Sequence, residues 1–278
     1  MRIALSSLLV ASVSAAALHA QYAEPSAVVL FDQSIGVASN LFGWATVGLG
    51  DVNGDGVLDL AVSAPFATVG GRSSAGRVYA LSGADGSTLW AHGESRTSAI
   101  LGYSLEVMDW NADGVLDVVT GAPFATVGRT WIFSGVDGAT LAELVGEATN
   151  SGFGAAVATG GDVDGDGTPD LLVAAPFRSV SGTESGRVYA FARGSTTPFT
   201  SLDGPFANAQ YGIGLAYLGD TDADGRDELV AGYRDAVSFF DGFAYLALGA
   251  WWAVAAWQKA EARELVPASV HRLAAARA

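Results

Sequence analysis

Asp162-Val-Asp164-Gly-Asp166-Gly167-Thr168-Pro-Asp170 is an acidic stretch of nine residues, and the chain contains four versions of it. The other three begin at Asp51, Asp109 and Asp220, so successive copies start 58, 53 and 58 residues apart. A pattern that returns at a nearly constant interval indicates tandem copies of one supersecondary unit. The sequence therefore predicts a repeat protein, and we number the acidic stretches loop 1 to loop 4 in chain order.

Each loop has the residue pattern of a site for a hard cation. Short oxygen-bearing side chains occupy positions 1, 3 and 5, glycine at position 6 permits a tight bend, and a carboxylate returns at position 9. Ca2+ accepts about six to eight oxygen ligands from such a loop, including the backbone carbonyl of position 7. Position 7 varies in chemistry, as expected if only its main chain is used. The pattern predicts up to four Ca2+ sites, with the candidate ligands Asp51, Asn53, Asp55, Val57 and Asp59; Asp109, Asn111, Asp113, Val115 and Asp117; Asp162, Asp164, Asp166, Thr168 and Asp170; and Asp220, Asp222, Asp224, Arg226 and Glu228.

Two other structures share part of this residue pattern. Asp-Gly and Asn-Gly pairs also form plain turns, but a turn explains the glycine and one acid, not four oxygen positions repeated in register. An EF-hand needs a glutamate at position 12. That interpretation is excluded because the twelfth positions are Val62, Thr120, Val173 and Ala231.

The residues around each loop predict short strands. Loop 1 lies between the apolar runs Ala45–Leu49 and Leu60–Val62, and a third run, Arg77–Leu81, precedes a fourth around Leu89-Trp90. Apolar runs this short, punctuated by glycine, are typical of strands. Four antiparallel strands in each unit correspond to one blade of a β-propeller.

The units resemble FG-GAP repeats, which form the blades of the integrin alpha-chain N-terminal β-propeller and of its bacterial relatives. The Phe-Gly position is held by Phe42-Gly43, Leu101-Gly102, Phe153-Gly154 and Tyr211-Gly212, and the Gly-Ala-Pro position by Ser63-Ala-Pro65, Gly121-Ala-Pro123 and Ala174-Ala-Pro176. The fourth unit departs from the Gly-Ala-Pro pattern, with Gly232-Tyr-Arg234, and from the loop pattern, with Glu228 in place of the last Asp. The resemblance covers roughly residues 27–243. It implies Ca2+ loops between the first two strands of each blade, and it implies no single activity.

The expected fold is therefore an all-β propeller of about four FG-GAP blades, each of four antiparallel strands, which makes it a small or partial propeller. Integrin propellers have seven blades. Ala27–Phe31 precedes Phe42-Gly43 as Leu89-Trp90 precedes Leu101-Gly102, so it is expected to supply an outer strand that closes the ring on the last blade. The alternative is a piece of a longer propeller.

Composition and chain ends predict an exported protein. Residues 1–20 have the charged start, apolar stretch and small residues of a signal peptide, residues 21–246 are assigned to the propeller, and residues 247–278 to an Ala-rich tail. The chain has no cysteine, and its net charge of −15 argues against a nucleic-acid partner. We expect secretion or a cell-envelope location. The apolar segment Phe243–Trp257 is shorter than the roughly 20 residues that cross a bilayer, so membrane contact is expected only through the tail.

No catalytic residues are predicted. His92 is interpreted as a surface residue, and the acids Asp85, Asp137, Glu94 and Glu147 as turn formers. The expected function is a non-catalytic binding or adhesion module for an extracellular protein or carbohydrate. The alternatives are a propeller that belongs to an extracellular polysaccharide hydrolase or lyase, and a structural fragment without a ligand. Three aromatic residues are assigned to packing between blades or to ligand binding: Phe66, Phe124 and Phe177.

Overall fold

A computed structural model describes residues 40–234 and 242–247, and the regular structure in these two ranges consists of fifteen β-strands without an α-helix. The strands form four antiparallel sheets that follow the four repeats. The all-β architecture predicted from the sequence is confirmed.

Three sheets have four strands, in the spatial order of the chain, and the fourth has three. The first sheet contains β1 (Thr46–Gly50), β2 (Asp59–Ala64), β3 (Arg77–Leu81) and β4 (Thr88–Gly93). The second contains β5 (Leu105–Met108), β6 (Asp117–Ala122), β7 (Arg129–Phe133) and β8 (Thr140–Val145). The third contains β9 (Ala156–Gly161), β10 (Asp170–Ala175), β11 (Arg187–Phe191) and β12 (Thr200–Asp203). The last contains β13 (Leu215–Gly219), β14 (Glu228–Arg234) and β15 (Gly242–Ala247).

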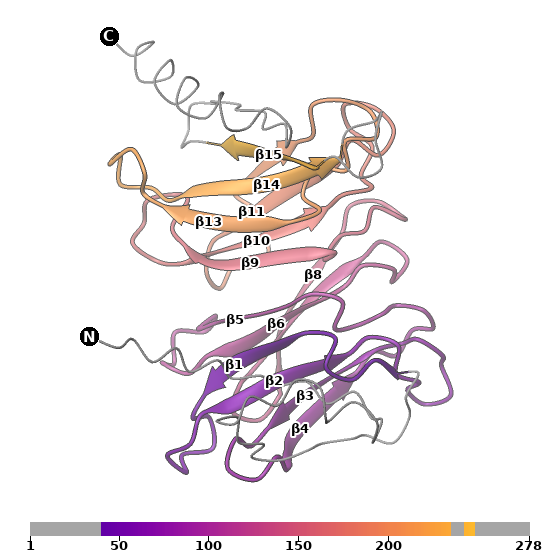
Figure 1. Ribbon diagram of the computed structural model, residues 1–278, viewed down its shortest axis with the longest axis vertical. Coiled ribbons are helices and arrows are strands. Elements are labelled where there is room, and N and C mark those ends of the chain that lie inside the picture. The colour runs from indigo at the N-terminus through magenta and orange to yellow at the C-terminus, as the bar shows by residue number, and fades with distance from the viewer. Residues whose placement is uncertain (1–39, 235–241, 248–278) are drawn as a thin grey trace, which may run out of the picture.

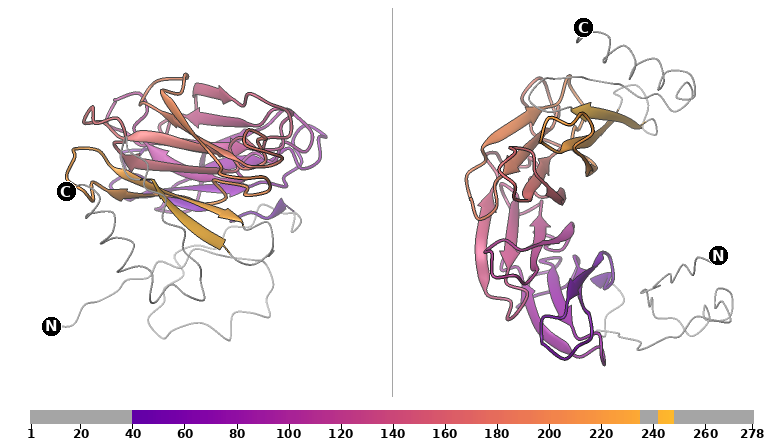
Figure 2. Two further views of the ribbon diagram at one scale, coloured as in Figure 1. Left: turned by 90° about the horizontal axis from the view of Figure 1, so that it is seen from above. Right: turned by 90° about the vertical axis from the view of Figure 1, so that its left-hand side faces the viewer.

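The sheets follow one another along an open arc (Figures 1 and 2). The first strands of consecutive sheets lie next to one another, β1 by β5, β5 by β9 and β9 by β13, while the first and fourth sheets occupy opposite ends of the arc. The predicted closing strand Ala27–Phe31, the signal peptide and nearly all of the tail lie outside the described residues. Strand β15 ends at Ala247, one residue into the predicted tail.

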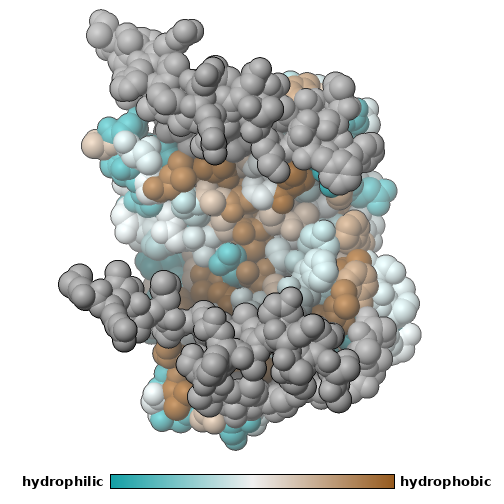
Figure 3. All heavy atoms as spheres, viewed as in Figure 1, coloured by the Kyte–Doolittle hydropathy of each residue, from teal (hydrophilic) through white to brown (hydrophobic). Residues whose placement is uncertain are grey.

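The core lies between the sheets. The second and third sheets each pack both faces against a neighbouring sheet, so their inner strands are apolar on both sides, and β6 and β10 are buried along their whole length. Three apolar clusters fill the successive junctions. Burial of each large side chain contributes about 1.5–3 kcal/mol, so these junctions hold the arc together. In the view of Figure 3, apolar residues gather along the middle of the visible face and again near its right-hand edge.

Candidate metal centres

Each acidic loop joins the first strand of a sheet to the second, and backbone conformation sets its shape. The position 6 glycines all have positive φ, from 83° to 87°. Position 4 also has positive φ in every loop, and there loops 2 and 4 carry alanine, Ala112 with φ 62° and Ala223 with φ 59°. The sequence pattern identified the first requirement but not the second.

The acid at position 1 folds the loop around itself. In loop 3, Asp162 Oδ1 accepts hydrogen bonds from the amides of Gly165 at 2.7 Å and Asp166 at 3.1 Å, and its Oδ2 accepts from Gly167 at 2.7 Å. Asp51 makes the same three contacts in loop 1, at 2.8–3.0 Å. These bonds curl the chain so that alternate side chains lie close together.

The acids at positions 3 and 5 accept further hydrogen bonds from amides within the loop. In loop 3, Asp164 Oδ1 accepts from the amide of Asp166 at 3.0 Å, and Asp166 Oδ1 accepts from the amide of Thr168 at 2.8 Å. The hydrogen bonds from Thr168 lower the pKa of Asp166. In loop 3 these hydrogen bonds therefore favour the charged form of Asp166 at the exposed side of the loop.

The acid at position 9 is buried at the start of the second strand and fastens loops 1 and 2 to a distant turn. Asp59 accepts from the amide of Val52 at 2.9 Å and, through Oδ1, from the amide of Gly83 at 3.0 Å, in the turn between the third and fourth strands. Asp117 makes equivalent contacts with Trp110 and Gly135. A Cβ on Gly83 would lie 1.9 Å from the carbonyl oxygen of Leu58, so only glycine fits there.

Loops 3 and 4 lack this second contact, which leaves a buried carboxylate oxygen without a hydrogen-bond partner on Asp170 (Oδ1) and on Glu228 (Oε1). Both residues are fully buried. Burial raises the pKa of Asp170 to about 6, with a further contribution from the nearby carboxylates of Asp164 and Asp162. An oxygen of this kind is costly to bury unless a proton or a cation joins it.

The acids converge most closely in the last two loops. In loop 3, one carboxylate oxygen from each of Asp162, Asp164 and Asp166 lies within 4.8 Å of the others. In loop 4 the same is true of four residues, Asp220, Asp222, Asp224 and Glu228. In loops 1 and 2 the position 3 residue is asparagine, and its amide donates to the position 5 acid, Asn53 to Asp55 at 3.0 Å and Asn111 to Asp113 at 2.8 Å. The residues of loops 3 and 4 therefore fit a divalent cation by both charge and convergence.

Loops 3 and 4 are also joined to each other, a feature that sequence reasoning missed. The carboxylate of Asp227, at position 8 of loop 4, accepts a hydrogen bond from the amide of Asp162 at 2.9 Å. The sequence showed Asp227 only as one more acid in the loop. No signal within a single repeat could have identified its partner 65 positions earlier.

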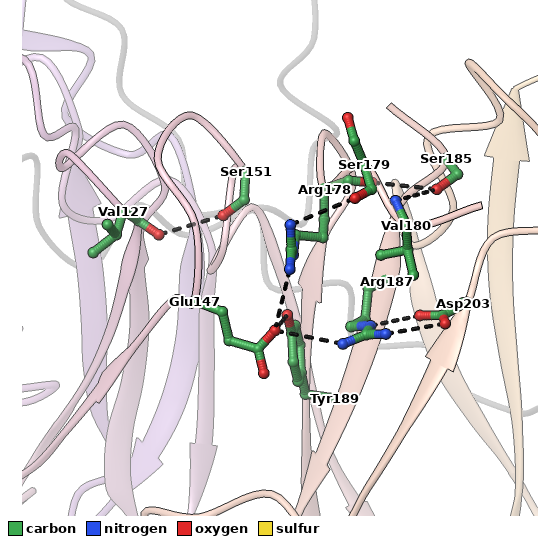
Figure 4. A network of polar contacts seen from close by, with 10 residues as sticks. All are labelled: Val127, Glu147, Ser151, Arg178, Ser179, Val180, Ser185, Arg187, Tyr189 and Asp203. Carbon is green, nitrogen blue, oxygen red and sulfur yellow. Dashed lines mark hydrogen bonds and ion pairs between the residues drawn. The ribbon is translucent and has the colours of Figure 1, made fainter. Parts of the chain in front are cut away.

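The interpretation of four acids as turn formers was half right. Asp85 and Asp137 each accept from a turn amide two residues later, at 2.8 and 2.9 Å. Glu94 and Glu147 instead reach the next sheet, because Glu94 accepts from the Trp131 indole at 3.1 Å. Figure 4 shows the second case: Glu147 accepts from the hydroxyl of Tyr189 at 3.1 Å and from Arg187 at 3.4 Å, and Arg178 lies 3.7 Å away.

His92 is partly buried and lies at a sheet junction. Its ring stacks on Phe133 of the second sheet with a centroid distance of 4.4 Å and an interplanar angle of 10°. Among the aromatic residues expected to pack or bind ligand, Phe124 is 48% exposed and its ring contacts Tyr103 at 5.9 Å, so the packing interpretation holds only in part for it.

The fold and the loops define a class, an all-β protein of tandem propeller blades with an acidic loop in each. Comparison with known families places two stretches, residues 42–81 and 153–191, in the FG-GAP repeat model. These stretches contain the first three strands of the first sheet and of the third. The chain contains FG-GAP repeats, as the Phe-Gly and Gly-Ala-Pro positions predicted.

Curated relatives match about half of the chain. Integrin alpha-5 of Xenopus laevis is 34% identical over 165 residues, 53% of this chain and 16% of its own length. Integrin alpha-V of Gallus gallus is 34% identical over 138 residues, with 46% and 13% covered. Phosphatidylinositol-glycan-specific phospholipase D of Bos taurus is 32% identical over 176 residues, with 55% and 21% covered. The chain thus spans about a fifth or less of the length of these relatives.

Solved structures give weaker likenesses. Rhamnogalacturonan lyase YesW aligns with a TM-score of 0.46 and 17% identity over 68% of this chain and 41% of that one. A Bacillus licheniformis rhamnogalacturonan lyase aligns with a TM-score of 0.45 and 16% identity, over the same shares of the two chains. Separately, within residues 40–234 and 242–247 no helix has the length and apolar character needed to span a bilayer.

Proposed function

We propose that this chain is a secreted or cell-envelope β-propeller module whose acidic loops bind Ca2+ and which recognises an extracellular protein or carbohydrate without catalysis. Residues 1–20 act as the signal peptide, residues 21–246 as the propeller and residues 247–278 as a tail. Up to four Ca2+ bind, one to each loop.

The observation that carries the proposal is the pair of buried oxygens of Asp170 and Glu228 without hydrogen-bond partners, next to converging carboxylates. Carboxylates this close repel one another, and a bound divalent cation reverses the sign of that interaction. Ca2+ suits the site because it accepts many oxygens in flexible geometry. The expected ligands are those named from the sequence, and the backbone carbonyls of Val57, Val115, Thr168 and Arg226 are included among them.

Binding of this kind stabilises the fold, which is its proposed role in a chain without disulfides. Extracellular Ca2+ modules bind with Kd of about 10⁻⁴–10⁻³ M. At about ten times Kd, each site adds about 1.4 kcal/mol to the free energy of unfolding, from RT ln(1 + [L]/Kd). The loops then hold consecutive strands in register, and the blade surfaces remain free to present a ligand-binding face.

The test is thermal unfolding of the mature protein with Ca2+ and with a chelator, together with elemental analysis of the purified protein. We expect a rise in melting temperature with Ca2+ that Asp166→Ala reduces. Leu58→Ala, which changes a side chain that is 72% exposed at position 8 of loop 1, is the control and should respond like the parent protein. Equal melting with and without Ca2+, with no bound metal, would overturn the proposal.

A second function is favoured by the match to phosphatidylinositol-glycan-specific phospholipase D, in which the related stretch is part of an enzyme. Under this alternative the propeller is the accessory or catalytic part of an extracellular enzyme, with polysaccharide as its substrate. An activity screen on polysaccharides with and without Ca2+ separates the two functions. Turnover that is lost when an acid outside the loops is changed would support the enzyme, and a glycan or protein array that retains a ligand without turnover would support the binding module.

A further inference from the structure

Loop 1 contains a chemically reactive pair of residues, Asn53-Gly54, at its positions 3 and 4. The chain has five asparagines, and Asn53 alone is followed by glycine. Asparagine is among the thermolabile residues. Its side-chain amide is lost most readily before glycine, because glycine has no Cβ to hinder its own amide nitrogen and its backbone adopts the conformations that ring closure needs. The residue order thus marks one position of the chain for this reaction.

The surroundings of the pair leave room for the reaction. Asn53 and Gly54 are both exposed to solvent. Gly54 has a φ of 78°, and a Cβ added to it would meet no atom within 4 Å outside its chain neighbours. The cyclic imide that forms in such a reaction therefore fits on this side of the loop, and water reaches it there.

Hydrogen bonds within the loop oppose the reaction. The amide of Gly54 donates to Asp51 Oδ1 at 2.8 Å, and the negative charge beside it disfavours the loss of the amide proton. The side chain of Asn53 is held at both ends, because its Oδ1 accepts from the amide of Asp55 at 2.9 Å and its Nδ2 donates to the carboxylate of Asp55 at 3.0 Å. All three bonds join exposed residues, so they open locally without unfolding of the sheet.

Loop 2 provides an internal comparison. Asn111 occupies the same position, accepts from the amide of Asp113 at 3.0 Å and donates to its carboxylate at 2.8 Å. The residue after it is Ala112, which has a φ of 62°. The two loops thus share the contacts of the asparagine and differ in the residue that must attack it.

We propose that Asn53 is a site of spontaneous deamidation and that the hydrogen bonds of loop 1 control its rate. The amide nitrogen of Gly54 attacks the side-chain carbonyl carbon of Asn53, and a C–N bond forms. The Cγ–Nδ2 bond breaks, and the departing nitrogen leaves as ammonia with the proton that the Gly54 amide loses. Water then opens the cyclic imide. Its addition at the side-chain carbonyl gives aspartate, and its addition at the backbone carbonyl gives isoaspartate.

The two products change loop 1 in opposite ways. Aspartate at position 3 gives loop 1 the acids at positions 1, 3, 5 and 9 that loops 3 and 4 have, and it replaces an amide that donates to Asp55 by a second negative charge. Such a loop favours a divalent cation more strongly. Isoaspartate adds a methylene group to the main chain between positions 3 and 4, so the loop no longer closes on its ligands. This effect on Ca2+ rests on the proposed function, whereas the deamidation itself does not.

Exchange of the residues at position 4 tests the site. The parent protein and a variant with Gly54→Ala and Ala112→Gly are kept folded in mildly alkaline buffer with a chelator, and their peptides are then analysed by mass spectrometry. Asn53 should gain the mass of one deamidation in the parent, and Asn111 should gain it in the variant. The Asp-Gly pairs of the loops isomerise without a change in mass and do not contribute. A parent protein without the gain, or a gain that does not follow the glycine, would overturn the proposal.

Removal of the hydrogen-bond acceptor tests the control by the loop. Asp51→Ala frees the amide of Gly54, so deamidation in chelator should become about tenfold faster or more, the lower range for loss of a hydrogen bond to a charged group. Asp85→Ala removes an exposed turn acid of the same sheet, is the control, and should leave the rate unchanged. Equal rates in Asp51→Ala and in the parent would overturn the control by the loop.

Ca2+ tests the same control without a mutation. At about ten times Kd, about one loop in eleven is free of Ca2+, so deamidation of the parent should become about tenfold slower. Calorimetric Ca2+ titration of the same samples separates two kinds of failure. Without Ca2+ binding the proposed function fails, and the deamidation in chelator still supports the site. Binding of Ca2+ to loop 1 without slower deamidation would overturn the control by the loop.

Discussion

The amide of Asp162 donates a hydrogen bond to the carboxylate of Asp227 at 2.9 Å, and the amide of Asp227 donates to the carbonyl oxygen of Asp162 at 2.6 Å. One residue opens loop 3 and the other lies in loop 4, so the two acidic loops that converge most closely are joined by a reciprocal pair of bonds. A change that orders one of these loops is therefore expected to order the other as well.

We therefore predict that Asp227→Ala weakens Ca2+ binding at both loops, although position 8 is not a ligand position. The expected loss is about fivefold or more at each site, which is the usual lower range for coupled sites. Calorimetric Ca2+ titration of the variant measures it. Leu58→Ala changes the same position in loop 1 and is the matched control. Weakening confined to loop 4 would contradict the coupling.

Ligand charge should rank the four loops. Loops 3 and 4 have acids at positions 1, 3, 5 and 9, whereas loops 1 and 2 have asparagine at position 3. More ligand charge favours tighter Ca2+ binding. Asp164→Asn should lower the affinity of loop 3 toward that of loop 1, and Asn53→Asp should raise the affinity of loop 1. Titration with Tb3+ luminescence follows both changes, and identical affinities in all variants would speak against side-chain coordination at position 3.

Ala112 has positive φ at position 4 of loop 2, where loops 1 and 3 have glycine. A residue with a Cβ is strained in that conformation by about 1–2 kcal/mol. At the equivalent position of loop 1, a Cβ added to Gly54 would meet no atom within 4 Å outside its chain neighbours. Ala112→Gly should therefore raise the free energy of unfolding by about 0.5–1 kcal/mol, and Gly114→Ala should lower it by about 1–2 kcal/mol. Denaturant unfolding compares the two variants. Stabilisation by both, or by neither, would show that φ does not control this loop.

Glu94 is buried and accepts hydrogen bonds from Trp131 and from Arg96, at 3.1 and 2.9 Å. Glu94→Ala leaves these donors without an acceptor, so a loss of about 2–4 kcal/mol in the free energy of unfolding is expected. Asp85→Ala removes an exposed turn acid of the same sheet and should cost less than about 1 kcal/mol. Unfolding in urea measures the free energy of unfolding of both variants. Equal losses would indicate that Glu94 acts only as a turn former.

Glu106 lies on the first strand of the second sheet, and partial burial raises its pKa above the ordinary value of 4.5. Between the ordinary pKa of a glutamate and the raised pKa of Glu106, the folded protein holds more protons than the unfolded one. The free energy of unfolding therefore falls as the pH rises through this range. Glu106→Gln should remove this fall: the variant is more stable than the parent at pH 7 and equal to it near pH 4. The measurement is the melting temperature of both proteins between pH 4 and pH 7, in the presence of a chelator.

The strands were predictable because the repeat set their limits. Arg77–Leu81 has the bounds expected from its apolar run, since a glycine turn ends the run. The loops were predictable for a similar reason, because their ligands lie within nine consecutive residues. Local order of this kind can be read from spacing alone.

Contacts between repeats were not predictable in the same way. Glu94 and Glu147 looked like turn residues because their partners, Trp131 and Tyr189, belong to the next unit. The repetition of Gly-Glu after two outer strands was a signal that could have identified them. For Asp227 and Asp162 there was no such signal, since among the four loops that the structure describes a single pair has this contact.

The four sheets are packed in series, in the order in which they occur in the chain. Among the described residues, the main contacts between sheets join sheets that are adjacent in the chain, so the residues that stabilise each junction come from consecutive units. Stability in such an array is the sum of what each unit and each junction contributes. Folding can begin in any unit and spread outward, and whole units can be added or removed by gene duplication or deletion without redesigning the others.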